Sequence, residues 1–420
     1  MSIDLGNAPV GTPPDSTQQQ QIRTAIGAIN DAPIDGQKYV RKDGEWLNMV
    51  PNRAYDSGNS ILLEVEGNAI PASWAGERTD VASVSFIPSL TTIGASAFDG
   101  CNQLSSITIP GSVTSIGSSV FNNCTGLTSA VFAEGFSMNY LPYSMFSGCT
   151  SLTSIAIPDS VTELRNLDWG TGVFTQSGLT SVDLNNVTMV GDAAFRLCTS
   201  LSSIEMPSVE QIGLGAFYAC PLTAVSFPNT LTSIGEVAFG YSGLQSVSIP
   251  DSVTSIGVDS FYGCASLASV SIGNGVTSIS SRAFYSCTSL VSVSIGSGVT
   301  SIGSFAFYGC TSLTGISLPS GVTTIESSAF AFTNINSVTI PDSVTSIGIQ
   351  AFAFTNITSV MIPANVTSIG TQAFNTCTEV YPQSTFEPAD ASAFGIGAIA
   401  YVSSGAGFGA TWCGLPVITF

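Results

Sequence analysis

The sequence contains no histidine and few charged residues of either sign. Only 9% of its 420 residues are charged, and 9 Lys and Arg against 28 Asp and Glu give a net charge of −19. Without histidine, Ser-His-Asp and Cys-His catalysis and imidazole metal sites are excluded. Residues 81–420 hold three bases, Arg165, Arg196 and Arg282, against 17 acids. This part of the chain repels phosphate, so we expect no nucleic-acid partner.

Long apolar runs are also missing. No stretch approaches the 18 apolar residues that a membrane-spanning helix needs, so we expect no membrane span. The opening MSIDLGNAPVGTPPD has neither a basic nor an apolar signal-peptide region, so no secretory signal is expected. These features predict a protein made in the bacterial cytoplasm.

One phrase of 23 residues dominates the rest of the chain. LQSVSIPDSVTSIGVDSFYGCAS, from Leu244, is followed at once by LASVSIGNGVTSISSRAFYSCTS and LVSVSIGSGVTSIGSFAFYGCTS. Self-similarity at a fixed period near this length predicts a solenoid, in which each copy packs only on its neighbours.

The same template extends over residues 81–379 and predicts thirteen rungs, each marked by one phenylalanine. These landmark residues, 21 to 28 apart, are Phe98, Phe121, Phe146, Phe174, Phe195, Phe217, Phe239, Phe261, Phe284, Phe307, Phe330, Phe352 and Phe374. A short strand with alternating inward residues is expected in each rung; within Leu152–Ile157, Ile155 and Ile157 should face the core. Strands that return every 23 residues must lie parallel, so we expect a parallel β-solenoid.

The repeat resembles the BspA-type, or Treponema pallidum-type, leucine-rich repeats of bacterial surface proteins. The resemblance covers about 300 residues and implies a scaffold that binds ligands or surfaces, without naming a ligand. Residues 51–80, with a strand at Ser60–Glu66, should form a linker and N-terminal cap. Residues 380–420 leave the template, and their aromatic residues are expected to seal the last rung.

Residues 1–50 read as a small separate α/β module. A short helix is expected over Gln18–Ile29, and strands over Lys38–Arg41 and Glu45–Val50 with a turn at Gly44. The segment DAPIDGQKYVRKDGEWLNMV is similar to N-terminal segments of tailed-phage virion proteins. That resemblance implies an anchoring motif made of Asp31, Pro33, Gly36, Tyr39, Arg41, Gly44 and Trp46.

Nine of the ten cysteines share one repeat position, three residues after the landmark Phe. The other four rungs carry Ser177, Ser242, Thr333 and Thr355 there. A disulfide partner or metal ligand would not be exchanged freely for Ser or Thr, so we predict a buried column of free thiols. Cys413, in the tail, is also expected to be free.

Two sets of aromatic residues are candidate contacts for a ligand or receptor. The third and fourth rungs are lengthened by EGFSMNYLPYSM and NLDWGTGVFTQ, and we expect these segments to expose Tyr140, Tyr143 and Trp169. The second set follows landmark Phe residues and should stack as a stripe: Tyr218, Tyr262, Tyr285 and Tyr308. A half-buried packing role is the alternative for the stripe.

The outward strand positions hold small hydroxyls, as at Ser246, Ser248, Ser269 and Ser271. Such a face could hydrogen-bond a glycan or order water, or it could simply keep the rod soluble. Acids such as Asp183 and Glu205 could work in pairs on a glycan or hold calcium. We favour solvated surface acids and assign no catalytic, cofactor or metal residue.

Together these features predict a non-enzymatic virion structural protein. The phage-like start would contact other virion proteins in a tail or head fibre, and the rod would attach to a glycan or protein of the host surface. The alternatives are a capsid decoration or spacer protein without receptor binding, and a bacterial surface adhesin. A homotrimer, common among fibres, remains open.

Overall fold

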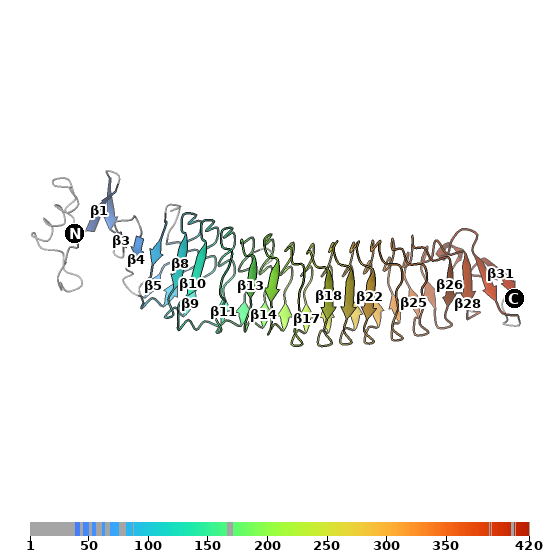
Figure 1. Ribbon diagram of the computed structural model, residues 1–420. Helices are drawn as coiled ribbons and strands as arrows, with labels where there is room; N and C mark the ends of the chain where they lie inside the picture. Colours follow the sequence, from blue (N-terminus) through green and yellow to red (C-terminus); the bar gives the residue numbers. More distant parts are fainter. Residues whose placement is uncertain are drawn as a thin grey trace, which may run out of the picture.

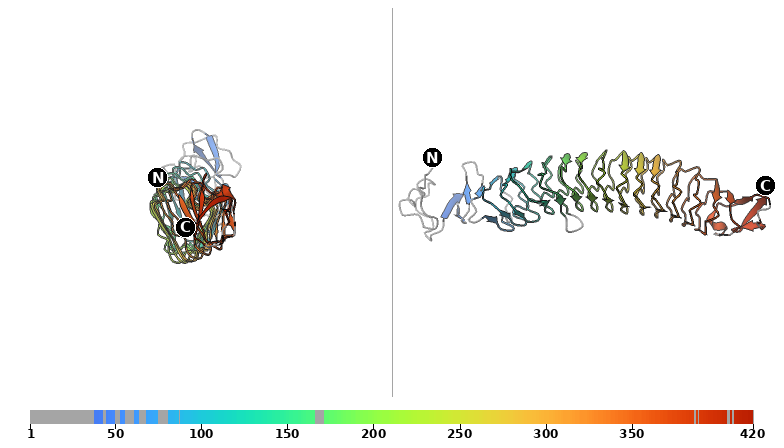
Figure 2. Two further views of the ribbon diagram at one scale, coloured as in Figure 1. Left: turned by 90° about the vertical axis from the view of Figure 1, so that its right-hand side faces the viewer. Right: turned by 90° about the horizontal axis from the view of Figure 1, so that it is seen from below.

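The computed structural model is a long rod of stacked turns of chain (Figure 1). It describes residues 38–42, 45–49, 53–55, 61–63, 68–74, 81–86, 88–165, 171–385, 387, 389–404, 407 and 409–419. Viewed along the axis the turns overlie one another in one compact outline, and viewed from below the rod curves gently (Figure 2).

Each full rung contributes a short second strand, from its Val-Thr-Ser-Ile segment, and most rungs also contribute a first strand, from the Ser-Val-x-Ile segment. The first strands are β4 (Ile61–Leu63), β6 (Val84–Ser85), β8 (Ser106–Ile109), β10 (Ser129–Phe132), β13 (Ser181–Asp183), β15 (Ser203–Glu205), β18 (Ser246–Ile249), β20 (Ser269–Ile272), β22 (Ser292–Ile295), β26 (Ser359–Ile362), β28 (Glu379–Pro382) and β29 (Ile399–Val402). The second strands are β5 (Ala69–Ile70), β7 (Thr92–Ile93), β9 (Ser115–Ile116), β11 (Tyr140–Leu141), β12 (Glu163–Leu164), β14 (Met189–Val190), β16 (Gln211–Ile212), β17 (Ser233–Ile234), β19 (Ser255–Ile256), β21 (Ser278–Ile279), β23 (Ser301–Ile302), β24 (Thr324–Ile325), β25 (Ser346–Ile347) and β27 (Ser368–Ile369).

Strands of successive rungs pair in parallel, and equivalent residues lie opposite one another. Ser246 pairs with Ser269, which pairs with Ser292, and β16, β17 and β19 continue the same register on the second-strand side. The parallel β-solenoid of leucine-rich-repeat type, with about fourteen turns, is thus confirmed.

The inward residues follow from the alternation of side chains along a strand. Along β18 the burial pattern alternates between exposed and buried residues. The same alternation holds at Leu152–Ile157, where Ile155 and Ile157 are buried and Ser154 is exposed, although no strand is formed there. The prediction of which side chains enter the core is confirmed in this rung.

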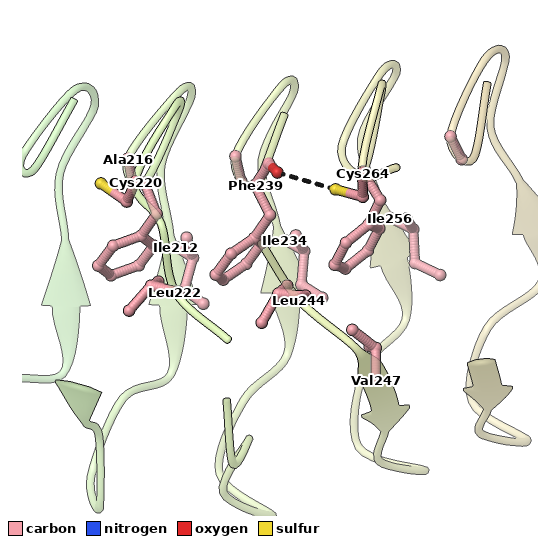
Figure 3. Close-up of a cluster of buried hydrophobic side chains, with 14 of the residues drawn as sticks. Ile212, Ala216, Cys220, Leu222, Ile234, Phe239, Leu244, Val247, Ile256 and Cys264 are labelled. Atoms are coloured by element: carbon pink, nitrogen blue, oxygen red, sulfur yellow. Dashed lines mark hydrogen bonds between the residues drawn. The ribbon is translucent and has the colours of Figure 1, made fainter. Parts of the chain in front are cut away.

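The landmark phenylalanines form one buried stack through the whole rod. Their neighbouring ring centroids lie 5.1–5.8 Å apart with nearly parallel planes. Figure 3 shows Phe239 between the Ile and Leu side chains that surround it in the core. Parallel rings at this spacing bury large apolar surfaces and gain dispersion energy with each neighbour.

The stack extends beyond the expected limits of the array at both ends. Phe394 adds a fourteenth ring, 6.2 Å from Phe374, within the segment expected to be only a cap. Trp412 then closes this end 6.1 Å from Phe394, and Trp74 closes the other end 5.4 Å from Phe98. The predicted aromatic seal is confirmed, and rung geometry continues past the consensus because any large ring fills the slot.

The last rungs form a five-stranded sheet ordered β26-β28-β29-β31-β30. The two final strands, β30 (Thr411–Trp412) and β31 (Leu415–Thr419), form an antiparallel hairpin against β29. A short 3₁₀-helix, η1 (Ala391–Ala393), carries the chain to the fourteenth ring.

Before the first rung, β1 (Lys38–Lys42) and β2 (Glu45–Met49) form an antiparallel hairpin. The two strands expected in the N-terminal module are therefore confirmed, while the expected helix over residues 18–29 lies outside the described residues. A third strand, β3 (Arg53–Tyr55), pairs with β4, and β4 pairs in parallel with β6 of the solenoid. The strand expected near residues 60–66 is present and leads into the array.

All ten cysteines are buried, and none of them forms a disulfide. Seven of these thiols each donate a hydrogen bond of 2.9–3.3 Å to the main-chain carbonyl of the landmark Phe in the previous rung. Thr333 and Thr355 occupy the same slot and donate instead to the Phe carbonyl of their own rung. The predicted thiol column is confirmed, and its hydrogen bonds explain why Ser and Thr substitute for Cys.

Candidate functional site

A row of aromatic side chains follows one edge of the rod, on the turn after the buried Phe of each rung. Seven consecutive rungs contribute one ring each: Tyr218, Tyr241, Tyr262, Tyr285, Tyr308, Phe332 and Phe354. Neighbouring ring centroids are 4.5–5.6 Å apart, so the row is continuous. We call these seven rings the aromatic edge.

The middle of the aromatic edge is a face-to-face stack. Tyr262 and Tyr285 lie 5.1 Å apart at 10°, and Tyr285 and Tyr308 lie 4.9 Å apart at 8°. Their neighbours cover the ring faces, and all three side chains are half-buried. The predicted stripe therefore exists, and its central members are half-buried rings stacked face to face.

Tyr241 is turned across the row. Its ring makes angles of 89° with Tyr218 and 72° with Tyr262, and 51% of the residue is exposed. A Cβ placed on Gly263 would lie 2.8 Å from two carbons of this ring. Only a glycine at 263 leaves room for Tyr241, which rests one side of its ring there and exposes the rest.

The far end of the aromatic edge is apolar. Phe332 and Phe354 lie 4.5 Å apart, and 42% and 49% of these residues is exposed. Phe305 approaches Tyr308 at 5.6 Å and is 37% exposed. Because exposed phenylalanines gain little from folding, these three rings form a surface that core packing does not require.

Backbone conformation sets the exposed rings apart from the stacked ones. Tyr241, Phe332 and Phe354 stand two residues after their landmark Phe and have φ of 56–57°, in the left-handed region. Four other rungs place Gly at this point, as in Gly263 and Gly309, and five place another residue in the same conformation: Asn123, Gln176, Leu197, Ala219 and Ser286. A bulky residue held there costs about 1–2 kcal/mol. The left-handed turn is thus common to the rungs, and these three differ from the others by the exposed ring that they place on it.

Charged groups border the tyrosine part of the aromatic edge. The Arg196 guanidinium lies 5.4 Å from the centre of the Tyr218 ring. Arg282 forms a 2.7 Å ion pair with Asp259. Burial raises the pKa of Asp259, the Arg282 guanidinium partly offsets this, and Glu236 adds to it. Asp259 therefore lies near enough to the exposed ring of Tyr241 to help raise the pKa of that tyrosine.

Of the first-ranked aromatic candidates, the two that the structure describes, Tyr140 and Tyr143, are half-buried. Tyr140 lies in β11 and is half-buried, and the Arg165 guanidinium covers its ring at 3.9 Å while also bonding Glu163 at 2.7 Å. The prediction of an exposed loop ring at 140 is wrong, because this segment pairs with β12 as an ordinary second strand. Tyr143 is half-buried, and Trp169 lies outside the described residues.

The anchoring motif is described only in part. Tyr39 and Arg41 lie in β1 and Trp46 lies in β2, where Arg41 is the register partner of Trp46. The remaining members lie outside the described residues: Asp31, Pro33, Gly36 and Gly44.

The serine face is hollowed rather than flat. A groove of about 680 Å³ crosses four rungs beside β18, β20 and β22. Hydroxyls of Ser248, Ser271 and Ser294 line it. At its border the amide nitrogens of Asn274 donate to Asp251 Oδ1, at 2.6 Å from the main chain and 3.2 Å from the side chain, and the Ser297 N–H donates to Asn274 Oδ1 at 2.9 Å. These polar groups bond one another, so the groove is a weaker candidate than the aromatic edge.

The acids considered for catalysis include one adjacent pair. Asp183 and Glu205 are exposed register partners in β13 and β15. Among the described residues, no three His, Cys, Asp or Glu side chains gather in a group that could hold a metal ion. In the same part of the chain, no helix is long and apolar enough to cross a membrane.

Comparison with known families decides what kind of repeat this is. The model of the BspA type leucine-rich repeat region (6 copies) matches residues 73–167, 168–288 and 256–381, well over half of the chain. The chain belongs to the BspA-type leucine-rich repeat family. The matched residues begin and end close to Trp74 and β28, so they coincide with the solenoid.

Several solved structures are similar to this BspA-type rod. A leucine-rich repeat protein from Bacteroides ovatus is 27% identical, with 75% of this chain and 94% of that chain covered at a TM-score of 0.46. A leucine rich cell surface protein from Faecalibacterium prausnitzii is 25% identical, with 84% and 96% covered at 0.41. The pneumococcal vaccine antigen PcpA is 16% identical, with 91% and 99% covered at 0.44. No curated protein matches the sequence.

Within the BspA-type array, the sequence alone missed the most exposed rings. Tyr241, Phe332 and Phe354 follow their landmark Phe by two residues, whereas the predicted tyrosines follow by one. The turn brings both positions to the same edge, so the rings form one row. A search for aromatic residues one or two positions after each landmark Phe would have found all seven rings of the aromatic edge.

Proposed function

We propose that this chain is a non-enzymatic rod that is displayed at a cell surface and binds a macromolecular partner through its aromatic edge. The observation that carries this proposal is the set of exposed rings at Tyr241, Phe332 and Phe354, each held in a left-handed conformation. Large apolar rings in exposed positions gain little from folding, so core packing does not account for them, and exposed apolar patches mark interaction surfaces.

The composition of the aromatic edge supports a binding role. Tyrosine, phenylalanine and arginine are enriched at the cores of protein interfaces, where a few aromatic and Arg side chains contribute most of the affinity. Here Tyr241 stands between Arg196, at the neighbouring ring Tyr218, and the Arg282–Asp259 pair. Membership of the BspA-type family supports the adhesin interpretation, because the repeat is typical of bacterial surface proteins.

A matched pair of variants tests the binding role. Replacing Tyr241, Phe332 and Phe354 by Gly, the residue that four other rungs use there, removes the rings and relieves the backbone. Labelled full-chain protein should bind a panel of bacterial and mammalian cells, and the triple variant should lose at least tenfold in affinity by flow cytometry. A control with Val131→Ser and Val291→Ser, exposed apolar residues elsewhere, should bind as before. Equal binding by the triple variant would refute the role of the edge.

The second candidate function is that of a virion appendage, in which the rod is part of a phage particle rather than of a cell surface. Its support is the phage-like segment DAPIDGQKYVRKDGEWLNMV, which lies before the residues matched to the repeat family. Immunogold labelling with antibody to the solenoid distinguishes a cell-surface adhesin from a virion appendage. Signal on the surface of cells that encode the protein supports an adhesin, and signal on phage tails supports a fibre. Signal over phage heads would favour a decoration or spacer protein.

The non-enzymatic part of the proposal has its own test. Asp183 and Glu205 are neighbours on the rod surface, the arrangement from which carboxylate-only glycan hydrolysis would have to start. Purified protein should release no reducing sugar from host polysaccharides. Release that Asp183→Asn or Glu205→Gln abolishes would contradict the proposal.

A further inference from the structure

We propose that the occupant of the aromatic edge is an extended segment of a partner protein rich in lysine and arginine. This inference rests on the proposed function, in which the edge is the binding surface, and adds the chemistry of what binds there. It follows from the charge of the rod, the contacts of its own arginines and the acids beside the exposed rings.

The charge of the rod selects a cationic partner. Residues 81–420 contain 17 acids and three arginines. All three arginines are already engaged: Arg165 with Glu163 and Tyr140, Arg196 with Tyr218, and Arg282 with Asp259. A surface whose few cations are already in contact with rings or acids attracts positive segments and repels negative ones.

The rod itself displays the contact that such a segment would make. Among the described residues, the cation–ring contacts are those of Arg165 over Tyr140 and Arg196 over Tyr218. Arg196 thus lies over Tyr218, the first ring of the aromatic edge. The next ring, Tyr241, turns across the row and leaves half of its surface exposed, and an Arg or Lys of a partner can take the equivalent place there.

Acidic side chains near the aromatic edge can attract the basic side chains of the proposed partner. Asp259 is buried, its Oδ2 bonds Arg282, and its Oδ1 has no hydrogen-bond partner. The pKa of Tyr241 is raised by a hydrogen bond to Tyr262, by burial and by nearby groups that include Asp259, so this carboxylate acts on the exposed ring. Toward the other end of the edge, Glu326 accepts hydrogen bonds from Ser304, the neighbour of Phe305.

The dimensions of the edge suit an extended chain. Ring-to-ring steps of 4.5–5.2 Å from Tyr241 to Phe354 span roughly 25 Å, the length of about eight extended residues. The apolar end at Phe332 and Phe354 offers contact to the aliphatic stems of long basic side chains.

Two other occupants fit less well. A sugar ring stacks on an aromatic face, and the faces of Tyr262, Tyr285 and Tyr308 are covered by one another. A second copy of this chain would bring another acidic rod of net charge −19 against the first. A second copy remains an outcome that the following experiments separate.

The probe is a fluorescein-labelled decapeptide of alternating Arg and Ser, with an alternating Glu and Ser peptide as its counterpart. Fluorescence anisotropy with the full chain at 50 mM NaCl should detect the Arg peptide and not the Glu peptide. Raising NaCl to 300 mM should weaken binding at least threefold, because the attraction is partly between charges. The Tyr241→Gly, Phe332→Gly, Phe354→Gly variant should bind the Arg peptide at least tenfold more weakly.

Carboxylate variants provide the second measurement. Glu236→Gln combined with Glu326→Gln should weaken Arg-peptide binding about threefold, and Val291→Ser should leave it unchanged. Circular dichroism confirms that each variant is folded. If the Arg peptide binds the triple glycine variant and the parent equally, the attraction is a general property of an acidic rod and the inference is wrong.

The outcomes also separate this inference from the proposed function. Loss of cell binding in the triple glycine variant, with no Arg-peptide binding by the parent, would keep the aromatic edge as the contact surface and reject a basic partner. Cell binding unaffected by the triple variant would reject both. A dimer seen by light scattering that the triple variant dissociates would instead assign the edge to a second copy of this chain.

Discussion

The Cys264 thiol donates a hydrogen bond of 3.2 Å to the main-chain carbonyl of Phe239, one rung earlier (Figure 3). The bond joins two neighbouring rungs through their turn segments, where no strands pair. Because the donor is a side chain, any residue with a small donor can serve at this point. The same slot in the Phe239 rung holds Ser242, whose hydroxyl lies 3.2 Å from the Cys264 sulfur.

Substitutions at Cys264 should follow hydrogen-bonding capacity. We expect Cys264→Ser to change the free energy of unfolding by less than about 1 kcal/mol, because a hydroxyl can still donate to Phe239. Cys264→Ala removes this donor but leaves the carbonyl with the Ser242 N–H at 3.1 Å, so it should cost about 0.5–1.5 kcal/mol. Urea denaturation followed by circular dichroism measures both. A serine variant less stable than the alanine variant would contradict the role of the bond.

The buried thiols should resist alkylation and weaken the fold at high pH. Burial raises the pKa of Cys149 to about 12 and that of Cys377 to about 11, from an ordinary value of 9.0. A raised pKa in the folded state favours folding fully below pH 9, and this contribution is lost as pH rises toward 11–12. Iodoacetamide should therefore label the cysteines only after unfolding, as mass spectrometry would report. Cys149→Ser should flatten the loss of stability above pH 9.

A gap in the phenylalanine stack should be costly. Phe239 lies 5.2 Å from Phe217 and 5.5 Å from Phe261, and is fully buried. Phe239→Ala removes both contacts and leaves a cavity, so we expect a loss of about 3–5 kcal/mol. The denaturation midpoint should fall accordingly, whereas Phe354→Ala, an exposed ring, should leave it nearly unchanged. Equal effects of the two variants would contradict the assigned role of the stack.

Gly263 and Tyr241 should be coupled. Gly263→Ala places a methyl group 2.8 Å from the Tyr241 ring at a φ of 67°, and should cost about 1–3 kcal/mol. In the Tyr241→Gly background only the backbone part of that cost remains, so the penalty should be smaller. Thermal unfolding of the four proteins in a double-mutant cycle measures the coupling. Additive effects would show that the ring does not rest on this glycine.

Removing Arg282 should destabilise the rod in a pH-dependent way. Burial already raises the pKa of Asp259, and loss of the guanidinium removes the group that opposes this shift. The variant must bury an unpaired carboxylate at pH 7, while near pH 4 the carboxyl becomes neutral. We therefore expect the stability deficit of Arg282→Ala to be larger at pH 7 than at pH 4. Arg165→Ala, whose partner Glu163 is more exposed, serves as the control.

Much of the scaffold could be predicted because each rung repeats one local pattern. The alternation in Leu152–Ile157 marks Ile155 and Ile157 as core residues without knowledge of any neighbour, and the landmark Phe does the same for the stack. The limits of the array could not be predicted in this way. Trp74 and Phe394 extend the stack without the consensus around them, because the end slots require only a large ring.

The candidate site was predictable only in part. The four tyrosines at one repeat position were found, since periodicity marks them. Tyr241 and Phe332 occupy the next position, and only the path of the turn brings them into the same row. Conversely, Tyr140 was expected to be exposed, yet strand pairing in β11 and the nearby Arg165 cover it.

The sequence by itself determined the solenoid, the inward side of each rung and the burial of its thiols outside disulfides, because these depend on patterns within one repeat. Only the tertiary structure decided which rings of different rungs touch, which faces they expose and where acids meet them. Those contacts join residues about 22 apart in sequence, as in Tyr241 on Gly263. They depend on left-handed turns and on the stacking distance between rungs, which no single repeat encodes.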